Sequence, residues 1–178
     1  VSSVSLSKSS DSSCALPHPF VDRNKEIPII ILIVVFFSDG QPVQGAQFEF
    51  SFDTIGNRTS AKSGTTTSSS TSYTANNLNQ YSQRTVVDEI LVTGEAVTGS
   101  TVSVRLNTNN AALVNRHGEY FWKTVEADNS SAIFFTTNLK VTAYITSGTT
   151  SLVRTETRTA IVPQTPEAFT WNLDGNLL

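Results

Sequence analysis

The sequence is 178 residues long, with 38% hydrophobic residues, 15% charged residues and a formal net charge of −3 at pH 7. A chain of this length can bury a real core, as one ordinary domain or two small ones. The negative charge excludes the basic field that nucleic-acid binding needs, and the low charge content is typical of many extracellular β proteins.

Single residues limit the chemistry further. Cys14 is the only cysteine, so an intramolecular disulfide and a cysteine-based metal cluster are excluded, whereas an intermolecular disulfide stays open. Methionine is absent even at position 1, which favours a processed or excised piece or a numbering that starts after an initiator. The longest apolar run, 29–37, is far shorter than the roughly 20 residues of a spanning helix, so no membrane span is predicted.

The chain begins with a polar stretch, 1–27, which is rich in serine and contains Pro17 and Pro19. We interpret it as a flexible arm or linker. The run 29–37 follows; its β-branched and aromatic residues predict a strand buried on both faces. A turn at 38–42 and a second strand at 47–52 complete a hairpin.

The stretch 48–58 combines an alternating aromatic strand with an acidic turn. The side chain of Asp53 can accept the backbone N–H two residues on, and Gly56 tolerates positive φ. We therefore expect a tight turn, with Arg58 starting the return strand. Residues 62–72 are almost entirely Gly, Ser and Thr and predict an exposed loop. Residues 28–83 thus form an apolar strand plus β-hairpins.

From residue 84 the chain alternates short strands and turns, and no helical pattern of ten residues occurs. This spacing predicts an all-β fold with an antiparallel β-sandwich over 84–163. The expected strands are 86–93, 101–106, 119–125, 133–137, 139–145 and 152–162; the expected turns are 107–110, 115–118, 129–131 and 146–150. Residues 164–178 begin a further hairpin motif.

Three stretches, 52–58, 73–81 and 171–177, resemble the YD repeats of the Rhs family. The shared pattern is an aromatic residue, Asp or Asn, two or three residues, then Gly-Asn or Leu-Asn. Its turn residues here are Asp53, Gly56, Asn57, Asn76, Asn79, Asp174, Gly175 and Asn176. Residues 86–162 resemble the Ig-like module found between repeats in some bacterial Rhs proteins. The resemblance covers about 38–178 and not 1–37.

The resemblance implies an extracellular or cell-surface location and a shell of coiled YD repeats around a C-terminal effector. This chain holds only a few repeats, so it would be a fragment of such a shell. A few stacked units cannot bury a continuous core alone. The Ig-like module, a partner chain or the run 29–37 would have to complete it.

No catalytic, cofactor-binding or metal site is predicted, and no cofactor. His18 and His117 lack neighbours at metal-ligand spacing, and neither a G-x-S-x-G elbow nor a phosphate-binding loop occurs. Asp39, Asp53 and Asp174 precede glycine turns, which we assign to turn geometry in preference to calcium binding. Tyr120 and Trp122 share one face of a strand, and packing or an interface is favoured over a sugar platform. Asn57 and Asn129 lie in glycosylation sequons in predicted turns, where they would be accessible.

Two functional hypotheses follow, both non-enzymatic and both with other protein chains as partners, copies of the chain itself included. The first is a structural segment of an Rhs-like extracellular protein. The alternative is a filament or adhesin subunit that donates an apolar strand to the next subunit. The residues of that strand are Ile29, Ile31, Ile33, Val35 and Phe37. A secreted hydrolase, with a triad of His117 and Asp88 or Asp128, is the least favoured class.

Overall fold

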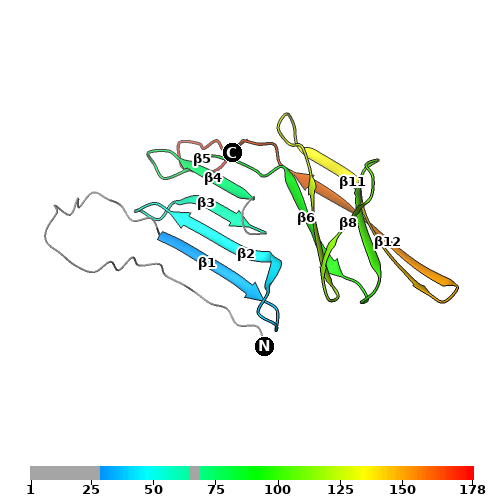
Figure 1. Ribbon diagram of the computed structural model, residues 1–178. Helices are drawn as coiled ribbons and strands as arrows, with labels where there is room; N and C mark the ends of the chain where they lie inside the picture. The colour runs from blue at the N-terminus through cyan, green and yellow to red at the C-terminus, as the bar shows by residue number, and fades with distance from the viewer. Residues whose placement is uncertain (1–28, 65–68) are drawn as a thin grey trace, which may run out of the picture. The chain divides into compact units, whose positions relative to one another are not determined.

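The computed structural model describes residues 29–64 and 69–178, so the predicted arm 1–27 lies outside the described residues. The described elements are all β-strands, and the strands pair with their neighbours in antiparallel fashion. The predicted all-β fold class is therefore confirmed. The described residues divide into two compact units: unit 1 comprises those up to 84 and 168–178, and unit 2 comprises 85–167 (Figure 1).

Unit 1 is built on one sheet of six strands in the order β1-β2-β3-β4-β5-β13. The strands are β1 (Ile29–Phe36), β2 (Pro42–Phe52), β3 (Arg58–Ser63), β4 (Ser70–Ala75), β5 (Tyr81–Arg84) and β13 (Glu167–Ala168). The first five follow one another as a meander, so short turns suffice to join most of them. Ile31 and Ile33 of β1 lie opposite Phe50 and Phe48 of β2, which puts these apolar side chains on one face.

Two predictions for this sheet are wrong. The run 29–37 was expected to be buried on both faces, but β1 is the end strand, and Ile29, Ile30 and Leu32 are 55%, 47% and 37% exposed. An end strand has a neighbouring strand on one side only, so its side chains are covered less than those of a central strand. The loop expected over 62–72 is also shorter than predicted: β3 runs to Ser63 and β4 begins at Ser70. Polar side chains do not prevent these strands from pairing, because one face of an antiparallel sheet can be open to solvent.

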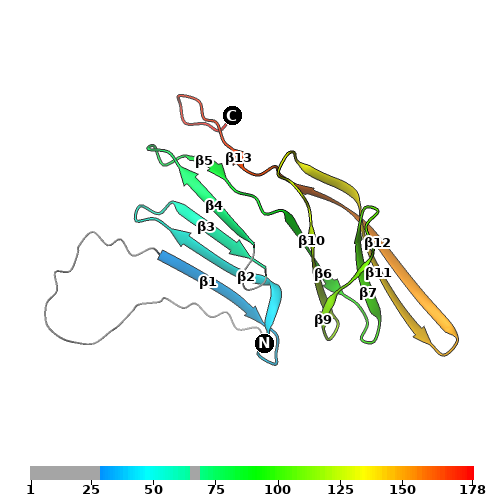
Figure 2. The same ribbon diagram turned by 45° about the horizontal axis from the view of Figure 1, so that its top comes forward.

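Unit 2 is a sandwich of two antiparallel sheets (Figure 2). One sheet has the order β6-β10-β9, with β6 (Glu89–Glu95), β10 (Tyr120–Glu126) and β9 (Asn115–His117). The other has the order β12-β11-β7-β8, with β12 (Thr150–Val162), β11 (Phe134–Ser147), β7 (Thr101–Leu106) and β8 (Ala112–Leu113). The sandwich architecture predicted for this part of the chain thus consists of a three-stranded and a four-stranded layer.

The core of unit 2 is drawn from both of its sheets. Val102, Val104 and Leu106 alternate along β7 and are 2%, 1% and 6% exposed. They join Val92 of β6, Phe121 of β10 and Leu139 of β11 in one hydrophobic cluster. Burying each such side chain contributes about 1.5–3 kcal/mol to stability. The cluster is therefore a hydrophobic core that lies within unit 2.

Two further boundaries in unit 2 differ from the sequence prediction. Residues 115–118 were expected to form a turn, but Asn115–His117 is strand β9, paired with Tyr120–Trp122 of β10. The strands expected at 133–137 and 139–145 are a single strand, β11, with a register shift between Thr136 and Leu139. At that shift the buried Thr136 hydroxyl donates to Asn107 Oδ1 at 2.5 Å, so a side-chain bond replaces the interrupted ladder.

Candidate functional site

Three five-residue turns in unit 1, 53–57, 76–80 and 172–176, share one hydrogen-bonding scheme. The first residue donates its backbone N–H to the carbonyl of the fifth, at 2.9, 2.8 and 3.0 Å respectively. The fourth residue donates to the carbonyl of the first, at 3.2, 3.0 and 3.0 Å. The side-chain oxygen of the first residue accepts the N–H groups of the third and fifth residues.

The chemistry of the first and fourth positions explains this scheme. Asp53, Asn76 and Asn172 each supply the side-chain oxygen, and for Asp53 the predicted bond to the N–H two residues on is present at 3.1 Å. The fourth position needs positive φ, which is +91° at Gly56, +60° at Asn79 and +82° at Gly175. Glycine and asparagine are the residues that adopt it most readily.

In the last repeat motif, Asp174 lies in the turn as its third residue, and its backbone N–H donates to Asn172 Oδ1 at 3.0 Å. The residue equivalent to Asp53 is Asn172. Spacing from the preceding aromatic identifies it, because Trp171 precedes Asn172 directly, as Phe52 precedes Asp53.

A fourth turn of the same backbone form joins β1 to β2. Phe37 N–H donates to the Gln41 carbonyl at 2.8 Å, and Gly40 N–H donates to the Phe37 carbonyl at 3.0 Å. The side chain of phenylalanine at the first position cannot accept N–H groups. The N–H of the fifth residue, Gln41, instead donates to Asp39 Oδ1 at 3.0 Å. Phe37 therefore lies in a turn outside β1, unlike its predicted place in the apolar strand. The turn predicted at 38–42 thus lies one residue earlier, at 37–41.

The three side-chain-capped turns are linked in a row at one end of the strands. Asn57 Nδ2 donates to Asn79 Oδ1 at 3.3 Å, and Arg58 N–H donates to the Tyr81 hydroxyl at 2.7 Å. Trp171 Nε1 then donates to the Tyr81 carbonyl at 2.8 Å, although the two residues are 90 positions apart. Each turn thus bonds to the next one, including across the insertion of unit 2 in the sequence. We call this set the turn row.

An aromatic ladder accompanies the turn row across the sheet. The rings of Phe48 and Phe50 stack with centroids 6.4 Å apart. The Arg58 guanidinium lies 4.8 Å from the Phe50 centroid and 5.6 Å from that of Tyr73, within cation–π range. Tyr73 in turn contacts Tyr81 at 5.4 Å. The ladder therefore connects β2, β3, β4 and β5 through side chains on one face.

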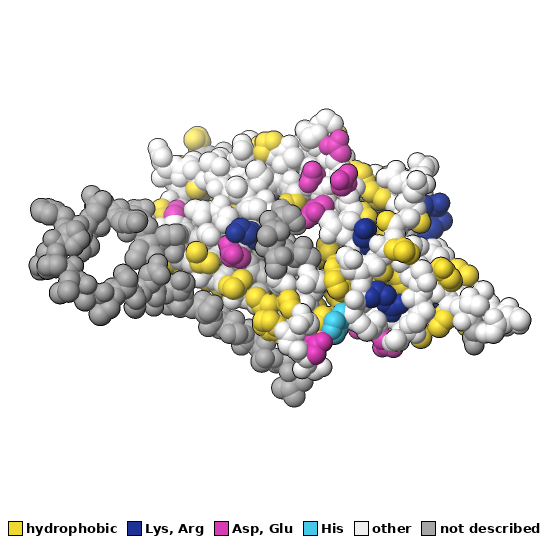
Figure 3. Space-filling model, viewed as in Figure 1, with side chains coloured by type: hydrophobic (Ala, Val, Ile, Leu, Met, Phe, Trp, Pro, Cys, Tyr) yellow, Lys and Arg dark blue, Asp and Glu magenta, His cyan; other side chains and the backbone are white. Residues whose placement is uncertain are grey.

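The ladder does not form a closed core. Every apolar side chain that is fully buried among the described residues belongs to unit 2. In β4, Thr71, Tyr73 and Ala75 are only half-buried, and the intervening side chains are exposed. Figure 3 shows hydrophobic side chains at the surface over β1 and β2. Unit 1 is thus a single sheet whose apolar face retains exposed area.

The ends of unit 2 are held together by Asn129. Its side chain is 0% exposed, and Nδ2 donates to the carbonyls of Val86, Val87 and Pro163 at 3.4, 3.3 and 2.8 Å. These carbonyls belong to the segments where the chain enters and leaves unit 2. The prediction of an accessible glycosylation sequon at Asn129 is therefore wrong. Asn57 is half-buried, with its amide engaged by Asp53 at 3.0 Å and by Asn79.

Two turn carboxylates have shifted acidities. Partial desolvation raises the pKa of Asp53, but the bonds that it accepts from the Asn57 side chain and from backbone N–H groups of the turn outweigh this, so the pKa lies below its ordinary 3.8. The hydroxyl and N–H of Ser130 lower the pKa of Asp128 in the same way. Both carboxylates are therefore ionised turn caps at neutral pH.

Other predicted site residues are spread apart. His18 and Cys14 lie outside the described residues, and His117 lies in β9. Within the described ranges, no group of three His, Cys, Asp or Glu residues is placed to hold a metal ion. The same ranges contain no helix of a length and hydropathy that could cross a membrane. Tyr120 and Trp122 stack at 6.0 Å on the face of β10 opposite the buried Phe121.

Comparison with known proteins gives no relative: no family model, curated protein or solved structure matches this chain.

Proposed function

We propose that this chain is a non-catalytic structural segment of an Rhs-like extracellular β-rich protein. In this proposal the meander β1–β5 and the C-terminal hairpin are repeat units of an extended sheet. Unit 2 is a module inserted between two consecutive repeats. The single observation that carries the proposal is the turn row, in which three turns of one design bond to each other in succession.

The turn row supports a repeat array because the same contact type recurs. The links from Arg58 to Tyr81 and from Trp171 to Tyr81 join successive turns at the same end of the sheet. Each link gives a hydrogen-bond partner to a polar group that would otherwise lack one within the protein. A sheet built in this way can grow by adding further hairpins, as in other repeat proteins.

The exposure of unit 1 supports the same proposal. A two- or three-layer domain buries its apolar face against another layer, whereas unit 1 has no fully buried apolar side chain among its described residues. In an array, neighbouring repeats would supply the missing cover. A structural role as one section of a larger β wrapping fits this lack of an internal core.

The insertion of unit 2 fits the proposal as well. Phe169 N–H donates to the Ser82 carbonyl at 2.9 Å, so the chain returns to β5 after the insertion. Asn129 and the bond from Val86 N–H to Thr165 Oγ1, at 3.0 Å, tie the two ends of unit 2 together. Domains whose ends meet are readily accommodated in loops of a host fold.

A tandem duplication of residues 42–84 tests the proposal. The duplicated chain adds two side-chain-capped turns to the row, so we expect the unfolding transition of unit 1 to move to higher denaturant, while that of unit 2 stays unchanged. Urea unfolding followed by tryptophan fluorescence separates the two, with Trp171 of unit 1 observed in a Trp122→Phe background and Trp122 of unit 2 observed in a Trp171→Phe background.

The matched control is the same duplication with Asp53, Asn76 and their copies replaced by alanine. This control adds the same length without the side-chain caps, so any increase in the urea midpoint of unit 1 should be smaller. An intact duplication that leaves unit 1 as labile as before would contradict the repeat-array proposal.

A further inference from the structure

Among the end strands of the described sheets, β12 in unit 2 and β1 in unit 1 contrast in chemistry. Backbone N–H and C=O groups at the margin of such strands can pair with another chain unless something prevents it. The side chains at each margin therefore decide whether that margin is protected or receptive.

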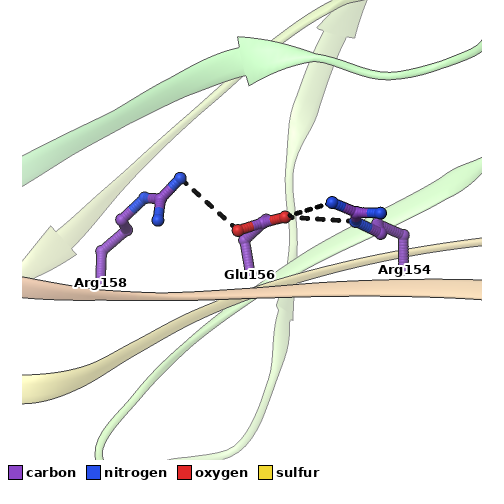
Figure 4. Close-up of polar contacts among 3 residues, drawn as sticks. All are labelled: Arg154, Glu156 and Arg158. Atoms are coloured by element: carbon purple, nitrogen blue, oxygen red, sulfur yellow. Dashed lines mark hydrogen bonds and ion pairs between the residues drawn. The ribbon is translucent and has the colours of Figure 1, made fainter.

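The margin of β12 carries a charged triad. Arg154 and Arg158 flank Glu156, with the Arg154 guanidinium 3.0 Å and the Arg158 guanidinium 3.5 Å from its carboxylate oxygens (Figure 4). Because residues two apart share a face, the triad is on the same face as Ala160 and Val162, which pack toward the core. Charged side chains along an end strand disfavour pairing with another sheet, because a second strand would have to desolvate them.

The margin of β1 has no such protection. Its eight residues, IIILIVVF, include no charged residue, proline or glycine. Ile29, Ile30 and Leu32 are exposed, and no described strand pairs on the side away from β2. Exposed apolar end strands of this length are sites of strand addition.

The side chains of β1 also restrict the partner. Ile29 and Ile31 project on the face of the phenylalanines, and Ile30 and Leu32 project on the other face, opposite Ser51 and Glu49 of β2. A matching strand must therefore offer apolar side chains on both of its faces. Strands that alternate, such as 47–52, offer them on one face only. Among the described strands longer than two residues, β1 is the one that is apolar at every position.

We propose that β1 pairs with β1 of a second copy of this chain. An antiparallel pair of identical strands has two-fold symmetry, so both copies use the same surface and the association closes at a dimer. The pairing would join the two six-stranded sheets through backbone hydrogen bonds and bury the exposed isoleucines. This inference goes beyond the proposed function, because the turn row lies in other strands and either claim can fail alone.

The test is the association state of the full-length chain, wild type and Leu32→Lys, by light scattering during size-exclusion chromatography over a range of loading concentrations. Lysine at position 32 lies opposite Glu49, which can pair with it within the sheet. A second copy, in contrast, would have to bury the ammonium group. Val153→Lys is the control, since Val153 is a 66% exposed residue of the protected strand β12. Far-ultraviolet circular dichroism verifies that each variant is folded, and Ile30→Lys replaces Leu32→Lys if that variant is not.

We expect a wild-type dimer, twice the 19.3 kDa of the chain, and an increase in the dissociation constant of at least about tenfold in Leu32→Lys. Val153→Lys should dimerise like the wild type. A wild-type chain that is monomeric at every concentration would overturn the proposal. So would a dimer that Leu32→Lys leaves intact, or one that Val153→Lys disrupts.

Discussion

Gly94 of β6 brings the strand backbone close to the Phe121 ring in the core of unit 2. It lies opposite Phe121 in the β6–β10 pair, and the Phe121 ring covers it. A Cβ added at Gly94 would lie 2.7 Å from Phe121 Cζ and 3.0 Å from Cε1. Contacts this short force the ring to move, and Phe121 is 6% exposed within the core cluster, where little space is free.

We therefore expect Gly94→Ala to destabilise unit 2 by about 1–3 kcal/mol, the usual cost of overpacking. For a domain of this size each kcal/mol lowers the melting temperature by about 4–8 °C. The measurement is the urea midpoint and the thermal midpoint of the unit 2 transition. Thr93→Ala, on the exposed side of the same strand, is the control and should stay within about 0.5 kcal/mol of the wild type.

A double-mutant cycle isolates the steric cause. In a Phe121→Leu background the ring is gone, so adding Gly94→Ala should cost less than about 0.5 kcal/mol. The opposite sign is a real alternative, because replacing glycine by alanine at an unstrained site stabilises by about 0.4–1 kcal/mol through the unfolded chain. A raised midpoint for Gly94→Ala would refute the packing argument, as would an equal cost in both backgrounds.

Three other changes have defined outcomes. Asn129→Ala leaves backbone carbonyls unpaired and should cost unit 2 about 1–3 kcal/mol in urea unfolding. Ser131→Ala removes the sequon and keeps the Asn129 side chain, so it should not destabilise unit 2; a glycosylating host should leave Asn129 unmodified. Tyr81→Phe removes the acceptor of the Arg58 N–H and should destabilise unit 1 by about 1–3 kcal/mol, with the exposed Tyr144→Phe as control. The folded pKa of Asp53 lies below 3.8, so the stabilising effect of its carboxylate is complete above that pH and is lost as pH falls through the folded value. Asp53→Asn should keep the turn and make the stability of unit 1 less dependent on acid pH, as measured by unfolding at a series of pH values.

Local turn chemistry could be predicted from the sequence, because it depends on a few consecutive residues. The Asp53 bond to the N–H of Ile55 and the positive φ of Gly56 follow from residue type alone. The turn predicted at 38–42 shows the limit of that reasoning: it begins at Phe37, an apolar residue that fits the preceding strand equally well, so the end of the strand could not be placed. In the last motif the turn could be recognised, and the structure adds that its N–H groups are accepted by the side chain of Asn172.

Burial could not be predicted in the same way, because it depends on strand order. An apolar run such as 29–37 is buried on both faces only if other layers pack on both faces of its sheet. The described strands of unit 1 form one sheet, and β1 is its end strand. The reverse error occurred at Asn129, a polar residue in a turn-like sequence that is 0% exposed. Its burial arises from carbonyls that lie more than thirty residues away in sequence.

The central claim is that unit 1 is an open repeat sheet without its own core, while unit 2 is a self-sufficient module. Native-state hydrogen exchange of the full-length chain, read by mass spectrometry, tests it most directly. We predict that amides of β7, β10 and β11 open only with global unfolding of unit 2, and that amides of β2 to β5 exchange through openings of much lower free energy. Equal protection in the two units would contradict the claim.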